Sequence, residues 1–447
     1  MKKVILLALA AVLLTAGMAA AEDWLQISGD YRFRYDSLKG DVHDYMQYDP
    51  GPPPTVTPVP GYTVKNNSIM MNRLGLNIKA DPVEDVVVKA RLVMYKVWGH
   101  QSSTPALGYF FADRYGATND GTVGHVPQDS VLRVDYAYAT VNNVLDQPLW
   151  ISVGRRPSTG GVPSNYRQNQ EKQGTAGIPS LMVNYAFDGF TIGYAPDIDA
   201  LPGAYAKFCG GRGYDSGYRG TYYYYPPYNN KDTDFYGLNV VPYDTEKLHL
   251  ELQYQIGKNI FDLPSDANPT TNVGDIDWYG GVVTTKMGGL NLFASAAVSK
   301  ADPNGNIGDM GAPMLDGEDH TGSAFYVGAR YDMDGTKIGL EYNQGSKYWI
   351  GMVPADDDIW TSKLGTRGNV YEVYVIQELK RKAVSKKGKA FVKIGYQYYD
   401  FKYTGSNNWI GPVAKIDDLN TTDPTLAQGL IPLDKAQDIY ATFDVQF

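Results

Sequence analysis

Ile439-Tyr-Ala-Thr-Phe-Asp-Val-Gln-Phe447, the last nine residues of the chain, alternate strictly between apolar and polar side chains. Successive side chains of a β-strand point to opposite faces, so one face would carry Ile439, Ala441, Phe443, Val445 and Phe447, and the other Tyr440, Thr442, Asp444 and Gln446. In a transmembrane β-barrel the first face meets lipid and the second a polar interior. The stretch predicts the closing strand of such a barrel; the alternative is the last strand of a soluble β-sandwich.

The aromatic carboxyl terminus on this strand resembles that of bacterial outer-membrane proteins, whose final strand commonly ends in Phe. The resemblance implies that Phe447 is an assembly signal, recognised by the barrel assembly machinery. It also implies a location in the outer membrane, in contact with lipid and lipopolysaccharide.

The amino terminus has the pattern of an export signal. Lys2 and Lys3 precede an apolar run over residues 4–14, and Ala19-Ala20-Ala21 forms a small-residue cleavage site. We therefore expect residues 1–21 to be a signal peptide and residues 22–447 to form one barrel domain. No later segment approaches the ~18 consecutive apolar residues that a membrane helix needs, so any membrane span would consist of strands.

Composition agrees with that class of protein. The 36 Tyr and 48 Gly and the mean hydropathy of −0.33 suit strands that alternate lipid-facing with water-facing residues. The net charge of −9 disfavours nucleic acid as a partner. A single cysteine, Cys209, excludes an internal disulfide and a C-x-x-C-H haem site.

Alternating segments recur along the whole chain. About sixteen can be marked, at 25–35, 69–80, 86–98, 131–141, 149–155, 181–187, 190–195, 234–241, 247–256, 277–285, 289–298, 323–331, 337–343, 370–378, 390–400 and 438–447. Short turns, such as Asp188-Gly189, alternate with long loops at 37–67, 99–130, 156–180, 196–233, 257–276, 299–322, 344–369 and 401–437. This arrangement predicts an all-β, antiparallel up-and-down transmembrane barrel of about sixteen strands, with short periplasmic turns and long extracellular loops.

Basic residues gather on the inward parity of the first four segments. They are Arg32, Arg34, Arg73, Lys79, Lys89, Arg91 and Arg133. On the lipid face each would cost about 2–4 kcal/mol at the membrane midplane, so we expect them to form a basic wall of the pore. By architecture the chain resembles sixteen-stranded porins, and this resemblance implies an arginine-rich wall facing acids across a constriction that an inward-folded third loop narrows.

The third loop is the candidate constriction. It carries Arg155, Arg156 and Arg167 but one acid, Glu171, which departs from the porin pattern. The opposing acids would instead be Glu251, Glu341 and Glu372 on later strands, and the constriction would prefer anions. The alternative is that all these charges are solvated in a wide aqueous interior.

Acidic clusters fall in two predicted outer loops. One holds Asp309, Asp316, Glu318 and Asp319, and the other is Asp356-Asp-Asp358. Carboxylates of this kind can hold Ca²⁺, but no spacing matches a defined calcium loop, so we expect solvated surface acids and no metal. Cys209 falls in the predicted loop 196–233, outside the cell.

These features favour a porin, a water-filled channel for passive diffusion of small hydrophilic solutes and ions, with no cofactor and no catalysis. One alternative is a barrel sheath around a partner such as a multihaem cytochrome. A less favoured one is a hydrolase at the barrel rim, where Asp319-His320 is an adjacent acid–His pair. A homotrimer, the cytochrome partner and the transported solute are left open.

Overall fold

The computed structural model describes residues 24–99, 127, 130–157, 160–172, 174, 177, 179–183, 187–214, 231–262, 271–308, 311–353 and 357–447. The predicted signal peptide, residues 1–21, lies outside these ranges.

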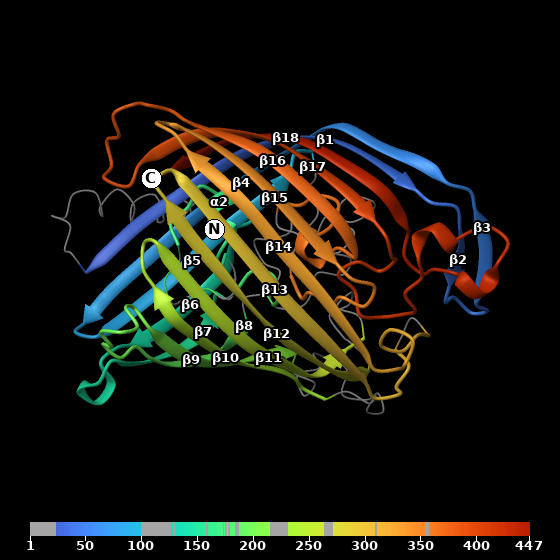
Figure 1. Cartoon of the computed structure of the whole chain (residues 1–447), viewed down its shortest axis with the longest axis horizontal. Helices are drawn as coiled ribbons and strands as arrows, with labels where there is room; N and C mark the ends of the chain where they lie inside the picture. The colour runs from blue at the N-terminus through green and yellow to red at the C-terminus, as the bar shows by residue number, and fades with distance from the viewer. Residues whose placement is uncertain are drawn as a thin grey trace, which may run out of the picture.

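Sixteen strands of the described chain close into one antiparallel barrel (Figure 1). They are β1 (Leu25–Val42), β4 (Tyr62–Val83), β5 (Val86–Val97), β6 (Arg133–Val141), β7 (Leu149–Arg156), β8 (Phe187–Tyr194), β9 (Tyr205–Tyr214), β10 (Thr233–Asp244), β11 (Leu248–Phe261), β12 (Asn272–Met287), β13 (Leu290–Pro303), β14 (His320–Asp332), β15 (Thr336–Gly345), β16 (Gly368–Glu378), β17 (Lys389–Phe401) and β18 (Leu433–Gln446). Each pairs with its neighbours in sequence, and β1 pairs with both β4 and β18. The predicted fold class is confirmed.

Few other elements are present among the described residues. A separate hairpin is made by β2 (Tyr45–Asp49) and β3 (Thr55–Val59). The helical segments are one short α-helix, α2 (Ser164–Arg167), and the 3-10 turns η3 (Val144–Asp146), η4 (Lys363–Gly365), η5 (Ile416–Asp418) and η6 (Pro424–Leu426). No helix among the described residues is both long and apolar enough to cross a membrane.

The closing strand follows the predicted alternation. Asp438, Tyr440 and Thr442 of β18 are buried toward the barrel interior, whereas Ile439 is 55% and Phe443 39% exposed on the outside. This two-residue period is what a strand between water and lipid requires, because a one-residue slip would send every polar side chain into lipid.

The outer surface carries an apolar band bordered by aromatic residues. Leu340, Val373 and Ile394 are exposed on neighbouring strands. Toward the long loops follow the paired rings of Tyr342 and Tyr371, whose centroids lie 5.0 Å apart. A lipid-facing band with such an aromatic border is the pattern of a membrane-spanning barrel.

The assignment of strands around residue 190 was wrong in two places. Asp188-Gly189 is not a turn, because both residues pair inside β8 with Arg212 and Gly211 of β9. Glycine at position 189 allows β8 and β9 to lie close together, because a Cβ there would lie 2.1 Å from the carbonyl oxygen of Gly210.

The missing strand is β9, which lies within the segment predicted as the loop 196–233. Residues 195–204 form a turn at the short-turn end, so Cys209 lies in a barrel strand and not in an outer loop. In the predicted strand 181–187, Leu181, Met182 and Val183 lie outside the barrel sheet and are buried in an apolar cluster, and Phe187 begins β8. One false and one missed strand offset each other, so the predicted count of sixteen agrees with the structure.

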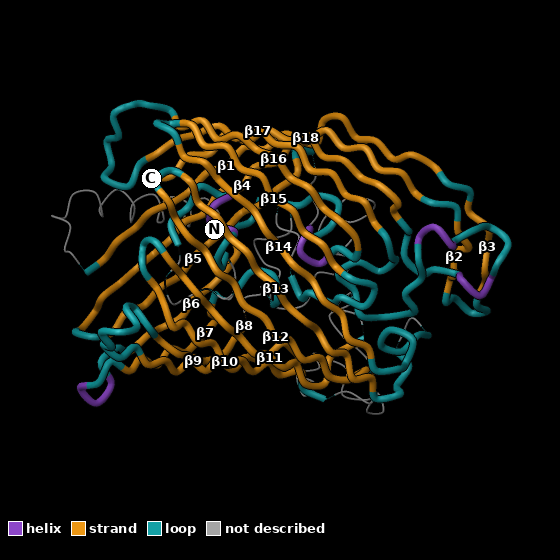
Figure 2. Tube along the Cα trace, in the orientation of Figure 1, coloured by secondary structure: helices purple, strands orange, loops and turns teal. Residues whose placement is uncertain are grey.

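The two ends of the barrel differ in their connections. Seven turns, at 84–85, 142–148, 195–204, 245–247, 288–289, 333–335 and 379–388, join strands at the end where Phe447 lies. The other end carries the long loops, which include the third loop (157–186), the seventh loop (346–367) and the eighth loop (402–432). Figure 2 shows loop segments at the long-loop end that turn back within the outline of the strands.

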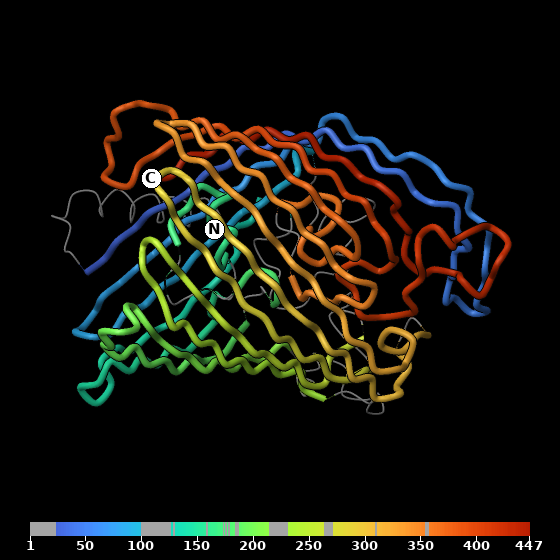
Figure 3. The backbone as a smooth tube through the Cα atoms, viewed as in Figure 1, coloured from blue at the N-terminus to red at the C-terminus, as the bar shows by residue number. Residues whose placement is uncertain are grey.

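At the long-loop end the barrel wall extends on one side. The strands β1 and β4 run on toward the β2–β3 hairpin, and the eighth loop lies beside it (Figure 3). Tyr48 N donates to Gln428 O at 2.9 Å, and Gln428 N donates to Met46 O at 2.8 Å. The first and eighth loops thus form one projection.

Candidate functional site

The interior of the barrel is partly filled by its own loops. Trp349 and Ile350 of the seventh loop and Leu181 of the third loop are fully buried in a cluster with Trp278 and Phe293 of the wall. Trp360 of the seventh loop is buried in a second cluster, against β1 and β18. Because apolar burial of this extent stabilises a fixed conformation, these loop segments are part of the core.

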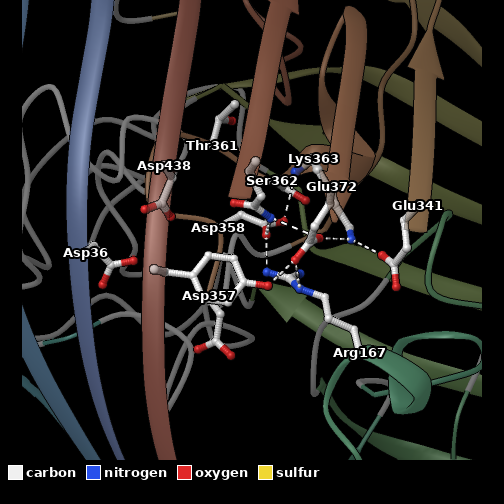
Figure 4. A network of polar contacts seen from close by, with 12 residues as sticks. Asp36, Arg167, Glu341, Asp357, Asp358, Thr361, Ser362, Lys363, Glu372 and Asp438 are labelled. Carbon is white, nitrogen blue, oxygen red and sulfur yellow. Dashed lines mark hydrogen bonds and ion pairs between the residues drawn. The ribbon is translucent and has the colours of Figure 1, made fainter. Parts of the chain in front are cut away.

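The seventh loop is also held by buried ion pairs. Lys363 Nζ hydrogen-bonds to the carboxylate of Glu372 at 2.6 Å and to that of Glu341 (Figure 4). Glu341 and Glu372 are paired residues of β15 and β16, and all three side chains are nearly inaccessible to solvent. These two predicted lumen acids therefore face a lysine of the seventh loop and not the arginines of the first strands.

The third loop joins the same network through Arg167, at the end of α2. Its Nη2 lies 2.6 Å from Asp358 Oδ1, and its Nε lies 3.0 Å from Glu372 Oε1. The third loop does fold inward, and Arg167 ties it to both the seventh loop and the wall.

Four residues of the predicted basic wall face the interior, but each has acidic partners. Arg34 lies 2.6 Å from Asp36 and 3.0 Å from Asp438. Arg32 pairs with Asp357 and Asp444, and Arg73 lies 3.9 Å from Asp357. Arg91 lies 2.6 Å from Asp30 and 3.3 Å from Asp135. The wall is therefore a set of buried ion pairs.

The remaining predicted site residues lie apart from that group. Lys89 is half-buried on β5, and Arg133 begins β6, opposite Val93. Arg155 and Arg156 end β7 and are not in the third loop. Arg155 pairs in register with exposed Asp188, while Arg156 lies over the ring of Tyr138 at 5.1 Å.

Glu251 and Glu171 have other surroundings. Glu251 lies 3.1 Å from His249 Nε2 and also accepts from Asn239. His249 Nδ1 in turn lies 3.1 Å from Asp244. Glu171 borders the cavity described below.

The expectation that Asp356-Asp-Asp358 is a solvated surface cluster was wrong for the two described members. Asp357 and Asp358 are each 3% exposed, inside the barrel. Asp358 accepts from Gln397 and from the backbone of Lys363 as well as from Arg167. Asp356 and Asp309 lie outside the described residues.

At the barrel rim His320 pairs with Asp316 and not with Asp319. Its Nε2 lies 2.7 Å from Asp316 Oδ1, and its ring stacks on Tyr348 with centroids 3.6 Å apart. Burial tends to raise the pKa of Asp316, but the hydrogen bonds from His320 and from the backbone, together with the charge of His320, outweigh it, so the net shift of the pKa is downward. Across the described ranges no group of three or more His, Cys, Asp or Glu is arranged to hold a metal ion.

An open space remains beside the filled region. A cavity of about 620 Å³ lies at the short-turn end, between the inner faces of β1, β4, β5 and β6 and the third loop. We call it the vestibule. Its lining is mainly polar and charged and includes Ser28, Asp30, Arg73, Asn77, Arg91, Asp135, Gln168, Gln170, Glu171, Lys386, Lys387, Lys389 and Phe447.

A family model described as "Protein of unknown function (DUF3373)" matches residues 63–447. The chain belongs to this family. Curated proteins contain no match to the chain.

Among solved structures, the in-vitro folded trimer form of OmpT, an outer-membrane protein of Vibrio cholerae, matches the chain with a TM-score of 0.42 at 12% identity, over 95% of this chain and 100% of that one. Outer-membrane expressed OmpT of Vibrio cholerae matches with a TM-score of 0.41 at 12% identity, over 94% and 97%. Both of these solved structures are outer-membrane proteins, and the chain is similar to them over nearly its whole length.

Proposed function

We propose that this protein is a passive outer-membrane channel for small hydrophilic solutes, without catalytic chemistry. The observation that carries this proposal is the vestibule, a polar space of about 620 Å³ inside a closed barrel. One water needs only ~10–15 Å³ of such volume, so the vestibule holds many waters or a hydrated solute. A lumen lined by charged and amide groups is the ordinary surface of an aqueous pore.

Because loops occupy part of the lumen, the path left for a solute is narrow. The third and seventh loops are joined to the wall and to each other through Arg167, Glu372 and Lys363, and aromatic residues of the seventh loop are buried behind them. A solute would therefore pass beside this fixed plug, on the side of β1 to β6. Only small solutes would fit.

The same filling argues against the cytochrome sheath. A multihaem partner would need the interior that Trp349, Trp360 and their neighbours occupy, and displacing them would expose a large apolar surface to water. A rim hydrolase has the Asp316–His320 pair in its favour, but a single paired carboxylate and imidazole does not make a nucleophile.

Single-channel recording of the refolded barrel in planar bilayers tests the proposal. Ser28 lines the vestibule, whereas its neighbour Ile27 is exposed on the outside. Ser28→Trp should lower the conductance, because the indole would occupy water-filled space. Ile27→Trp, the matched control, should leave it unchanged. A barrel that conducts no ions, or that conducts equally well with Ser28→Trp, would overturn the channel, and a haem absorption band in the purified protein would favour the sheath.

A further inference from the structure

One of the seven short turns is strongly basic, whereas each of the other six is acidic or carries no net charge. Residues 379–388 carry Lys380, Arg381, Lys382, Lys386 and Lys387, with Lys389 next, and no acid. The acids of the other six turns are Glu84, Asp85, Asp146, Asp197, Asp199, Glu246 and Asp334, and their only base is Lys247. The chain has a net charge of −9, and at this end of the barrel 379–388 is the one turn with a net positive charge.

Most of this positive charge is not neutralised by the protein. Lys380 pairs with Asp334, at an exposed site, and Lys389 Nζ donates to the backbone oxygen of Asn169 at 2.7 Å. Arg381, Lys382, Lys386 and Lys387 are exposed, and none of the four forms an ion pair within the part of the chain that the structure describes.

The basic turn borders the vestibule. Lys386, Lys387 and Lys389 line it. On the inner wall Arg91 is balanced by Asp30 and Asp135. The remaining acidic groups in the vestibule lining are Glu171 and the carboxyl terminus at Phe447, while Glu378, which precedes the turn, pairs with Lys337. The unpaired charge of the vestibule is therefore concentrated on the turn.

We infer that the turn 379–389 and the vestibule together form a capture site for small multivalent anions, of the oxyanion or polycarboxylate class. This inference rests on the proposed channel function and names the class of solute. Lysines on one turn can contact several negative charges of one solute at once, and an ammonium group binds phosphate-like or carboxylate oxygens as a point charge. The amide groups of Gln168, Gln170 and Asn77 line the same space and supply further hydrogen-bond donors.

Screening by salt sets the distance over which the site attracts an anion. At physiological salt the Debye length is ~8 Å, so exposed lysines attract an anion only when it is already close. Two acidic turns lie nearby: residues 84–85 join β4 and β5, and Asp334 pairs with Lys380. Lys386 and Lys387 form no such ion pair among the described residues, so their charges remain available to an anion in the vestibule. A multivalent anion gains more binding free energy than chloride does, because its attraction to each lysine is proportional to its own charge.

The test uses sulfate as the probe on the whole refolded barrel. Sulfate added at the short-turn side of a planar bilayer should reduce the chloride current more effectively than sulfate added at the loop side. Lys386→Gln with Lys387→Gln should raise the half-blocking concentration about fivefold, from the ~0.2–1 kcal/mol typical of each exposed charge interaction. Lys247→Gln with Lys286→Gln is the control, because both lysines lie at the same barrel end outside the vestibule lining.

A second measurement does not depend on conductance. Sulfate should protect Lys386 and Lys387 from an amine-acylating reagent, read by mass spectrometry, and should leave Lys247 unprotected. The anion site would be overturned, with the channel left intact, by two results together. Sulfate would block the Lys386→Gln, Lys387→Gln variant as well as it blocks the wild type, and it would leave the labelling of Lys386 and Lys387 in the wild type unchanged. Protection in a barrel that conducts no ions would keep the anion site and overturn the channel. Binding of an acidic protein to the turn without any sulfate effect would also overturn the proposed site.

Discussion

The ring of Phe447 lies over Gly29, where a side chain on the glycine would come within 2.6 Å of it. The same two residues exchange backbone hydrogen bonds, from Gly29 N to Phe447 O at 2.7 Å and from Phe447 N to Gly29 O at 2.9 Å. The last residue of the chain thus seals the seam between β18 and β1, and the glycine provides the space for its ring.

We expect Gly29→Val to hinder barrel closure as strongly as the loss of Phe447. The added methyl groups would meet the Phe447 ring, so the terminal residue could not reach its partner. Heat-modifiable migration of folded barrel on gels measures the outcome, and Phe447→Asp should lower the folded fraction in the same way. Ile27→Val, two residues earlier on the same face, is the control and should fold normally. Normal yields from Gly29→Val and Phe447→Asp would contradict this role of the seam.

The two-residue alternation of side chains along a strand explains which parts of the fold were predictable from the sequence and which were not. From Asp438 to Asp444 of β18 the alternation is unbroken, and each inward polar side chain forms a buried ion pair or hydrogen bond. In β9 the run Cys209-Gly-Gly-Arg-Gly213 offers few apolar side chains to alternate, so the strand was missed. The nearby Asp188-Gly189 imitates a hairpin turn, although its glycine is required for close approach to β9.

The candidate site was predictable only in part. The alternation of inward and outward residues correctly predicted that four arginines face the interior, Arg32, Arg34, Arg73 and Arg91. It did not predict the acidic partners that neutralise them. Asp36 and Asp438 share the parity of the arginines and could have been found on that basis. The inward position of Asp357 depends on the path of a long loop, which local pattern does not fix. Two tryptophans in the seventh loop were the available signal, because a fully solvated loop would expose them.

Lys363→Met should release the seventh loop from its anchor. The substitution leaves Glu341 and Glu372 buried opposite an apolar side chain, a change that typically costs about 3–5 kcal/mol. We expect a higher and noisier single-channel conductance and faster proteolysis within residues 346–367. Lys347→Met is the control: it lies in the same loop, with Nζ over the Tyr348 ring at 4.7 Å. Unchanged current and cleavage in Lys363→Met would show that apolar packing alone holds the loop.

Removing Arg91 should shift ion selectivity more than removing Arg73. Arg91→Gln leaves two carboxylates, Asp30 and Asp135, facing the vestibule, whereas the ion pair of Arg73 with Asp357 is longer, at 3.9 Å. The zero-current potential in a salt gradient should therefore move toward cation preference in Arg91→Gln and less in Arg73→Gln. Lys96→Gln, on the outward face of β5, should not change it. A potential that neither arginine substitution moves would place the selective charges elsewhere, with the basic turn as the next candidate.

Cys209 should react from within the pore and not from the cell surface. It lies on β9 with its Sγ 3.2 Å from the hydroxyl of Thr191, which is buried, while the next residue, Phe208, is exposed on the outside. A bulky membrane-impermeant maleimide added to intact cells should label it slowly, and a small thiosulfonate that enters the lumen should label it faster. A Thr55→Cys variant in a Cys209→Ser background supplies the control, because Thr55 is exposed on β3 of the projecting hairpin. Rapid labelling of Cys209 by the bulky reagent, at the rate of the Thr55→Cys thiol, would place the thiol outside the lumen and would contradict the position of β9 in the barrel wall.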